Sequence, residues 1–167
     1  MLVVSLLFVP GVAIPRADAA DLQPPPACRT AIDARLPGWR LSPPPDDLAA
    51  YAKQKNLTTN VVRGDFDDNG TQDTAVLLVM PGSDLLIRRQ YIAICLTQGR
   101  NTRLYLVREP YCGDGLAVAP KGTRAYDYST EKPVTYWTNG VSAYCFEKAG
   151  GTYLFRNGQF VLVVDSD

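Results

Sequence analysis

Residues 65–80 read Asp-Phe-Asp-Asp-Asn-Gly-Thr-Gln-Asp-Thr-Ala-Val-Leu-Leu-Val-Met, an acidic turn that runs directly into an apolar segment. The continuous apolar run over 74–80 predicts a strand that is buried on both faces. More strands are predicted by the apolar-rich segments 90–96, 102–107, 133–137, 141–147, 152–155 and 160–164. The chain after residue 60 is therefore expected to form a curved antiparallel β-meander.

Short turn motifs separate several of these segments. Gln98-Gly-Arg-Asn101 follows the second predicted strand, and Asn-Gly pairs stand at 139–140 and 157–158. Asn-Gly is a strong hairpin signal, because both central residues of the tightest turns need a positive φ. We predict a hairpin at each of these three turns. Residues 108–132, rich in glycine, proline, tyrosine and charge, are predicted to contain a long surface loop.

The N-terminal third has helical rather than strand character. Residues 28–36 have helical composition, and Pro37-Gly38 ends that segment. The segment 48–55 follows two aspartates and ends in lysines, a charge distribution that suits the helix dipole. The sequence therefore predicts an α+β fold, with two short N-terminal helices followed by the β-meander.

Composition bounds the functional classes. The chain has 167 residues, 46% of them hydrophobic, which suits one domain with a real core. Its 17 basic and 17 acidic residues give a net charge of zero, which disfavours electrostatic binding to nucleic acid. The absence of histidine excludes Ser-His-Asp and Cys-His catalysis and any histidine-ligated metal.

The first residues predict export. Residues 1–14 are almost wholly apolar but too short to span a bilayer, and Ala17-Asp18-Ala19 fits a signal-peptidase site. We predict a signal peptide over 1–19, a proline-rich leader over 20–27 and a single domain over 28–167. No later run is long enough for a membrane helix, so the mature protein is expected to have no transmembrane segment and to be periplasmic or extracellular.

The cysteine content agrees with export. An even number of cysteines behind a signal peptide predicts two disulfides. Three pairings are possible, and the sequence does not choose between them. Because no C-x-x-C occurs, neither a thioredoxin-like redox site nor a zinc knuckle is supported. The four residues are Cys28, Cys95, Cys112 and Cys145.

The acidic turn over 65–73 is the candidate metal site. Oxygen-bearing side chains stand at loop positions 1, 3, 5 and 9, and glycine stands at position 6. Calcium is a hard cation that takes six to eight oxygen ligands, so it needs several carboxylates from one tight turn. The alternative is a metal-free Asp/Asn/Gly-rich turn. The predicted ligands of a structural calcium ion are Asp65, Asp67, Asn69, the backbone carbonyl of Thr71, and Asp73.

This loop is not a complete EF-hand. Val76 stands at position 12, where the bidentate glutamate would be, and a strand follows the loop instead of a helix. The expected affinity is therefore that of extracellular modules, with a Kd on the order of 10⁻⁴ to 10⁻³ M.

The D-x-D-x-N-G-x-x-D pattern before an apolar strand resembles the calcium loop of FG-GAP and VCBS-type repeats. The wider layout is similar to small exported bacterial proteins with a single such loop. It includes a lead-in ending in Leu36-Pro-Gly-Trp39 and a terminal Ser166-Asp167. The resemblance implies a fold and a calcium ion but no reaction. Asp68 stands where that family usually has glycine.

Two functional hypotheses follow. The first is an exported, disulfide-stabilised, calcium-binding domain that is not an enzyme and binds or inhibits an envelope or extracellular macromolecule. Tyr111, Tyr126 and Tyr128 fall in the predicted long loop and are its candidate binding surface, although cross-strand packing also explains tyrosines. The alternative is a calcium-dependent hydrolase of phosphoester or glycoside bonds, which needs an open metal position facing Glu109 or Asp127.

Overall fold

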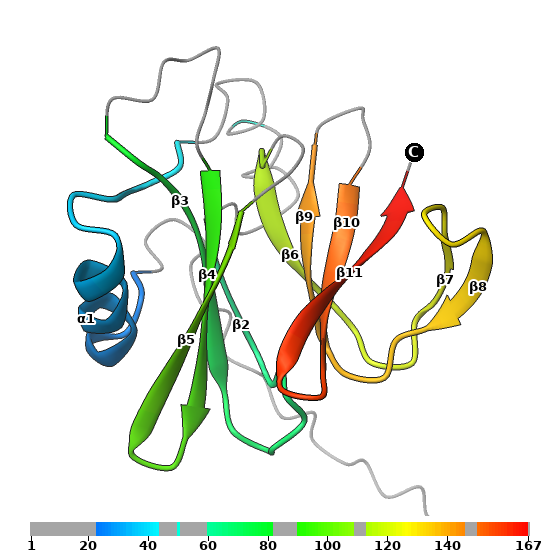
Figure 1. Ribbon diagram of the computed structural model, residues 1–167, viewed down its shortest axis with the longest axis horizontal. Coiled ribbons are helices and arrows are strands. Elements are labelled where there is room, and N and C mark those ends of the chain that lie inside the picture. Colours follow the sequence, from blue (N-terminus) through cyan, green and yellow to red (C-terminus); the bar gives the residue numbers. More distant parts are fainter. Residues whose placement is uncertain are drawn as a thin grey trace, which may run out of the picture.

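The computed structural model describes residues 23–43, 50, 60–81, 90–108, 113–145 and 150–166. Figure 1 shows two antiparallel sheets side by side, with the helix α1 (Pro26–Arg35) beside one sheet and a small hairpin beside the other. The first sheet has five strands and the second has four. Within these ranges the chain is therefore mostly β-strand.

The first sheet is built around the segment that the sequence analysis placed at its centre. Its order is β1-β3-β4-β5, and β2 also pairs with β3. On one side β3 is shared between two short strands: β2 pairs with its first half and β1 with its end. The strands are β1 (Arg40–Leu41), β2 (Val61–Gly64), β3 (Asp73–Val79), β4 (Gln90–Gln98) and β5 (Asn101–Arg108).

The second sheet has the order β11-β10-β9-β6, and a separate pair, β7 and β8, forms the small hairpin. All pairings in both sheets are antiparallel. The strands are β6 (Gly115–Ala119), β7 (Arg124–Asp127), β8 (Lys132–Thr135), β9 (Gly140–Tyr144), β10 (Gly150–Arg156) and β11 (Gln159–Ser166).

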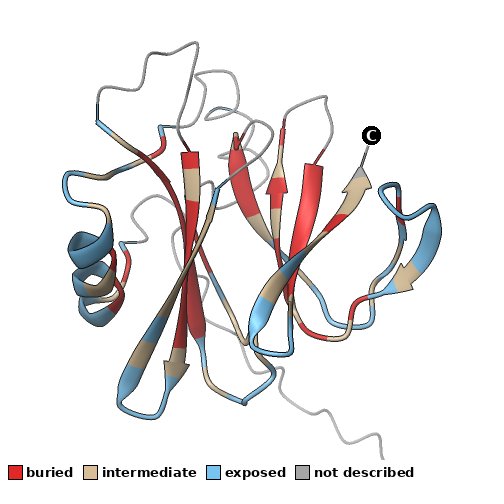
Figure 2. Cartoon of the chain, viewed as in Figure 1, coloured by how far each residue is buried: buried red, intermediate tan, exposed pale blue. Residues whose placement is uncertain are grey.

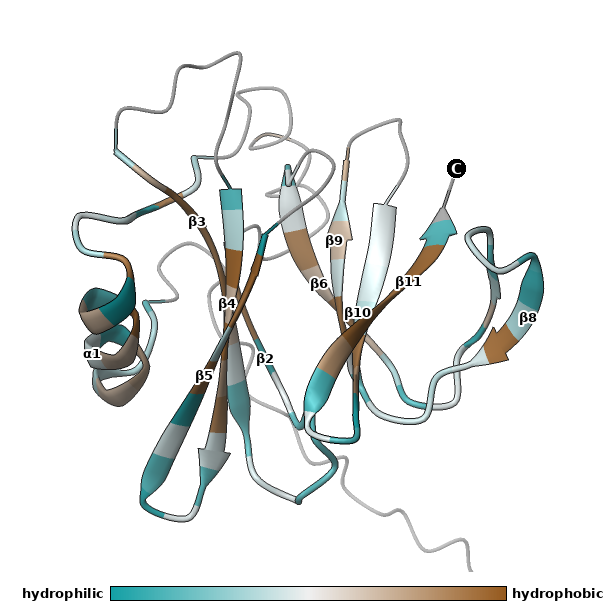
Figure 3. Ribbon diagram, viewed as in Figure 1, coloured by the Kyte–Doolittle hydropathy of each residue, from teal (hydrophilic) through white to brown (hydrophobic). Residues whose placement is uncertain are grey.

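Strand β3 is buried along its whole length because each of its faces meets a different core (Figure 2). Ala75 and Leu77 belong to the core between the two sheets. Val76 and Leu78 belong to a second core, which packs beneath α1. The alternation of side chains along a strand thus explains the continuous apolar run. Figure 3 shows hydrophobic residues in the middle of the strands and hydrophilic ones where β4 turns into β5.

Helix α1 starts and stops at local signals. Pro26 occupies its first turn, where the missing N–H costs no hydrogen bond. Gly38 adopts a φ of 80° just after its end. Cys28 and Ile32, one turn apart, are the buried residues of the helix and face the sheet. The helix predicted over 28–36 is therefore present.

The predicted α+β class with two N-terminal helices is wrong. The described residues form mostly antiparallel sheet with a single short helix, although the β-meander is present. The second predicted helix, 48–55, lies outside the described residues except for residue 50. The structure has more strands than the sequence patterns predict. Strand β1 follows directly on the turn after α1. Strands β6 and β7 occupy the segment 108–132, which was predicted to contain a long loop.

Two of the three predicted hairpins are confirmed. Gln98 pairs with Asn101 at the β4–β5 turn, and Asn157 and Gly158 adopt φ values of 52° and 83° between β10 and β11. The hairpin predicted at Asn139-Gly140 is wrong, because β8 pairs with β7 and Gly140 is instead the first residue of β9, opposite Ala119. A side chain at Gly140 would meet Thr152 Cγ2 at 2.3 Å, so tight packing explains this glycine.

A disulfide joins Cys28 of α1 to Cys95 of β4, with the two Cα atoms 5.6 Å apart. Cys145 is also disulfide-bonded, and no cysteine in the described part of the chain is free. Cys112 lies outside the described residues. The Cys28–Cys95 bond, which spans 67 positions of sequence, is compatible with one of the three possible pairings of the four cysteines.

The predicted signal peptide, 1–19, lies outside the described residues, as does the start of the predicted leader. The leader's last two residues, Pro26 and Ala27, are the first residues of α1. Within the ranges that the structure describes, no helix has the length and apolar character needed to cross a membrane.

Candidate metal centre

The acidic loop connects β2 to β3, and the Gly64–Asp73 pair holds its two ends together. Two residues inside it adopt left-handed backbone conformations: Asp68 with a φ of 61° and Gly70 with a φ of 81°. Glycine reaches this region without strain, and aspartate reaches it more easily than most residues. The aspartate at position 68 therefore supports the same reversal of the chain that a glycine would.

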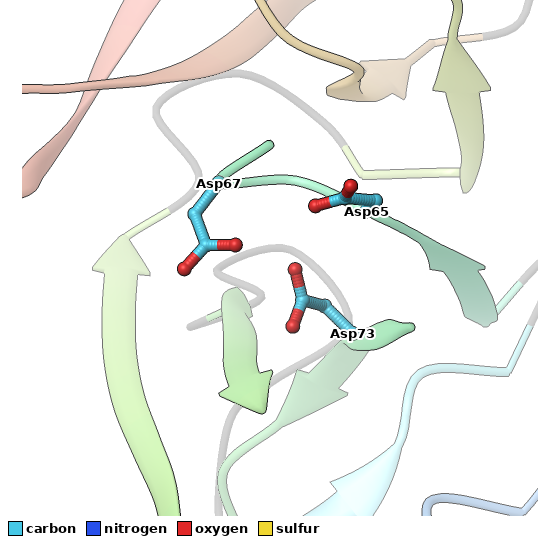
Figure 4. Close-up of side chains that lie close together, drawn as sticks. All are labelled: Asp65, Asp67 and Asp73. Carbon is cyan, nitrogen blue, oxygen red and sulfur yellow. The ribbon is translucent and has the colours of Figure 1, made fainter. Parts of the chain in front are cut away.

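The loop brings three carboxylates together. One oxygen from each of Asp65, Asp67 and Asp73 lies within 4.8 Å of the other two. Figure 4 shows the three side chains converging, with Asp73 extending from the start of β3 and the other two from the loop. Three negative charges at this spacing repel one another unless a cation or proton compensates them.

Asp73 is fully buried and joins the loop to the sheet. Its Oδ2 accepts a hydrogen bond from the backbone N–H of Phe66 at 2.8 Å, and its Oδ1 accepts one from Thr97 of β4 at 2.7 Å. Burial raises the pKa of Asp73 above its usual value, the two backbone hydrogen bonds oppose this, and the charges of Asp67 and Asp65 raise the pKa further. The site therefore carries an electrostatic cost that a bound cation would relieve.

Asp65 closes the turn itself. Its Oδ1 accepts a hydrogen bond from the backbone N–H of Asn69 at 3.0 Å, and its Oδ2 accepts one from Gly70 at 2.8 Å. A single carboxylate thus satisfies two amide groups in the tightest part of the loop, which fixes the position of the carboxylate itself.

Asp67 differs from the other two acids. Its Oδ1 is shielded from solvent and has no hydrogen-bond partner. A buried carboxylate oxygen without a partner is costly, and native proteins rarely retain one without a ligand or ion to satisfy it. Asp67 is therefore the residue whose surroundings fit a metal ligand best.

Asn69 and Thr71 lie on the same loop but face β4. The Oδ1 of Asn69 accepts a hydrogen bond from the backbone N–H of Thr71 at 2.7 Å and contacts the Thr71 hydroxyl. Its Nδ2 donates to the backbone carbonyl of Thr97 at 2.9 Å, and the Thr71 hydroxyl donates to the same carbonyl at 2.7 Å. The structure thus gathers three of the predicted ligand side chains and holds the Asn69 side chain in contacts with Thr71 and Thr97.

Asn139, absent from the predicted site, connects the loop to the second sheet. Its Nδ2 donates a hydrogen bond to the backbone carbonyl of Asp65 at 3.0 Å, and its Oδ1 accepts one from the backbone N–H of Lys121. Lys121 also forms an exposed ion pair with Asp68. No sequence signal marks this role, because 74 positions separate Asn139 from Asp65 and the Asn-Gly motif indicates a turn.

The donor set determines which ions the site suits. Carboxylate oxygens bind hard cations such as Ca²⁺ and Mg²⁺ and suit soft metals poorly. The clustered carboxylates and the unpartnered Asp67 oxygen thus fit a divalent hard cation. The carboxylates by themselves do not select calcium over magnesium.

The other residues singled out in the sequence lie away from this loop or outside the described residues. Tyr126 and Tyr128 are 44% and 49% exposed and form an edge-to-face pair on the β7–β8 hairpin. Burial opposes ionisation of Asp127 of that hairpin, but hydrogen bonds from Ser129 and Thr130 outweigh it and hold the pKa of Asp127 below its usual value. Tyr111 and Glu109 lie outside the described residues.

No protein-family model, no curated protein and no solved structure matches the chain. The resemblance to single-loop FG-GAP and VCBS-like proteins therefore stays a prediction that rests on the loop residues.

Proposed function

We propose that the loop 65–73 binds calcium as a structural ion. The observation that carries this proposal is the solvent-shielded, unpartnered Oδ1 of Asp67 beside the carboxylates of Asp65 and Asp73. Without a cation, the folded state must bear both the repulsion among three acids and one unsatisfied buried oxygen. A divalent ion relieves both costs, which makes its binding energy available to stabilise the fold.

The ion would act on the geometry of the first sheet. Asp65, Asp67 and Asp73 would hold it, with the Thr71 carbonyl as the further ligand that the loop pattern predicts. The Oδ1 of Asn69 already accepts a hydrogen bond from the Thr71 N–H and contacts the Thr71 hydroxyl, so Asn69 could join them only by leaving these contacts. Because Asp73 begins β3 and is bonded to Thr97 of β4, an ion there would fix the start of the central strand.

For the whole protein we propose an exported binding or inhibitor module without enzymatic activity, acting on an envelope or extracellular macromolecule in the periplasm or outside the cell. Disulfides such as Cys28–Cys95 persist in oxidising compartments, which supports export. The exposed pair Tyr126–Tyr128 offers aromatic rings with polar ends, the side chains that protein interfaces favour.

No contact among the described residues favours the calcium-dependent hydrolase. It requires a carboxylate directed at an open metal position. Both oxygens of Asp127 instead accept hydrogen bonds from its own hairpin, from Ser129 and Thr130.

Calcium titration of matched variants tests the site. With calcium tenfold above its Kd, the folded state should gain roughly 1.4 kcal/mol, and the Tm should rise by about 3–6 °C. Asp67→Asn should abolish the rise and the calorimetric binding signal. Asp68→Asn is the control: it alters a neighbouring carboxylate outside the cluster, and asparagine tolerates the φ of 61° found there. An equal response of Asp67→Asn and the unaltered protein would refute the site.

Export is tested separately from the metal. Protein recovered from its own cells should have no free thiols when it is unfolded in the presence of an alkylating reagent, and it should be found in the envelope or extracellular fraction. Four alkylated cysteines in protein from its native compartment would contradict export, whatever the calcium titration shows.

A further inference from the structure

A pocket of about 280 Å³ lies where the start of α1 meets the first sheet, beside the Cys28–Cys95 disulfide. Its walls come from α1, β2, β3, β4, β5 and the β4–β5 turn. The Asp73 side chain and the pocket lie on opposite faces of the sheet, although Gln72 of the acidic loop also lines the pocket. Thr74 lines the pocket and pairs with Cys95, whereas Asp73, the preceding residue of β3, points to the other face.

Two arginines are the charged residues that line this pocket: Arg63 of β2 and Arg100 of the β4–β5 turn. Within the part of the chain that the structure describes, neither forms an ion pair. Arg63 donates a single long hydrogen bond, of 3.4 Å, to the carbonyl of Gln23. Other arginines of the protein stack on aromatic rings, as Arg103 does on Tyr105, but neither pocket arginine stacks on a ring of a described residue. Among the described residues, neither guanidinium group therefore has a charged or aromatic partner.

The rest of the lining combines apolar groups of the α1 start and the disulfide with polar side chains, and none of it is acidic. Gln72, Asn101 and Thr102 contribute amide and hydroxyl groups, and the side chains of all three lack hydrogen bonds to other described residues. The first turn of α1, which also borders the pocket, contains no acidic side chain. Its backbone dipole adds to the positive potential of the arginines. The lining thus offers donors for an oxyanion together with partners for hydroxyl groups.

We propose that this pocket binds a small hydroxylated oxyanion, a sugar phosphate or a sugar acid. Guanidinium groups recognise phosphate and carboxylate through paired hydrogen bonds, which accounts for the two arginines. The amide and hydroxyl groups suit the hydroxyl groups of a sugar, and a volume of about 280 Å³ lies at the small end of ligand pockets. None of the three clustered aspartates lines the pocket.

Calorimetric titration of the full chain with defined probes tests this pocket. Glucose 6-phosphate and glucuronate present the two oxyanions on similar sugars, glucose lacks the charge, and inorganic phosphate lacks the sugar. The variants are Arg63→Gln, Arg100→Gln and the double variant. Arg124→Gln, an exposed arginine of β7 that does not line the pocket, is the control.

At least one sugar anion should bind, and it should bind more tightly than glucose and more tightly than inorganic phosphate. Each pocket variant should weaken that binding by about 10-fold or more, since each removes a charged hydrogen-bond donor, and Arg124→Gln should leave it unchanged. A preference between the two sugar anions identifies the oxyanion. The proposal is overturned if neither sugar anion binds, if glucose or inorganic phosphate binds as tightly as they do, or if the double variant binds like the unaltered protein.

Discussion

The three clustered aspartates differ in the hydrogen bonds that their carboxylates accept. Asp73 accepts hydrogen bonds from two backbone N–H groups in separate parts of the chain, and Asp65 accepts two within the loop. Asp67 leaves its buried Oδ1 without a partner. Two of the acids therefore hold the backbone of the loop, whereas the third makes no such contact and is the proposed metal ligand. Substitutions at the three positions should separate folding from metal binding.

Asp73→Ala should destabilise the metal-free protein, and Asp67→Ala should not. Removing Asp73 leaves the N–H groups of Phe66 and Thr97 without acceptors, which costs roughly 2–4 kcal/mol for the pair. Removing Asp67 relieves repulsion and an unsatisfied oxygen, so the free energy of unfolding should change by less than about 0.5 kcal/mol. Urea unfolding with a chelator present measures both, and equal losses would show that Asp67 also builds the loop.

Tyr136 gives the domain a pH dependence at the alkaline end. It is buried, and its hydroxyl donates a hydrogen bond to the carboxylate of Asp165. Burial first, and then this hydrogen bond, raise the pKa of Tyr136 from 10.0 to about 12. The folded state thus prefers the protonated phenol, so the stabilisation is complete below pH 10 and is lost as the pH rises through about 12.

Tyr136→Phe should therefore flatten the fall of stability between pH 10 and 12. The contribution of this residue to that fall is roughly 2–3 kcal/mol for a difference of about two pKa units. Denaturant unfolding at a series of alkaline pH values measures the slope. Tyr126→Phe, at an exposed position, is the control. Parallel curves for Tyr136→Phe and the unaltered protein would contradict the assignment.

Strands with a clear apolar pattern could be predicted from the sequence, because burial on both faces makes residues 75–79 of β3 continuously apolar. The two Asn-Gly pairs show the limit of local motifs. Asn157-Gly158 has the positive φ values of a tight hairpin, but Gly140 is extended and lies against β10. The same dipeptide thus meets a backbone requirement at one position and a packing requirement at the other. Only the fold distinguishes these two roles.

Gly140→Ala should destabilise the second sheet through a clash. A Cβ at this position would lie 2.3 Å from Thr152 Cγ2 and 2.8 Å from Leu154 Cδ2, and both residues are buried. Overpacking of this kind costs roughly 1–3 kcal/mol. Thr152→Ser removes the closer methyl group, so the double variant should recover part of the loss in thermal unfolding. Strictly additive effects of the two substitutions would argue against the clash.

The Cys28–Cys95 disulfide links α1 to β4 of the first sheet. It closes a loop of 67 positions, for which the loss of unfolded-state entropy is worth about 4 kcal/mol. The double variant Cys28→Ser with Cys95→Ser should lower the free energy of unfolding by that order. Amide exchange should show the largest loss of protection in α1 and β4. Uniform loss across both sheets would mean that the disulfide supports the whole domain rather than the helix.

The acidic loop lies at the junction of the two sheets, which is why part of the site could not be foreseen. The sequence places Asp65, Asp67 and Asp73 within nine positions, so their clustering follows from local spacing alone. The contacts that hold the loop come from far along the chain: Thr97 from β4, and Asn139 from the connection between β8 and β9. Such contacts depend on how the two sheets pack, and no local pattern records that packing.

Asn139 of the connection between β8 and β9 should help to keep the acidic loop ordered. Its side chain joins the carbonyl of Asp65 to the N–H of Lys121, so Asn139→Ala frees the loop on that side. The amide protons of Asn69 and Gly70, which bond to Asp65, should then exchange faster, and calcium should bind several-fold more weakly. Lys121→Gln removes only an exposed ion pair, which is worth less than about 1 kcal/mol, and should change neither quantity. Exchange is measured without calcium, so this result does not depend on the metal. Unchanged exchange at those two amides in Asn139→Ala would show that the first sheet alone holds the loop.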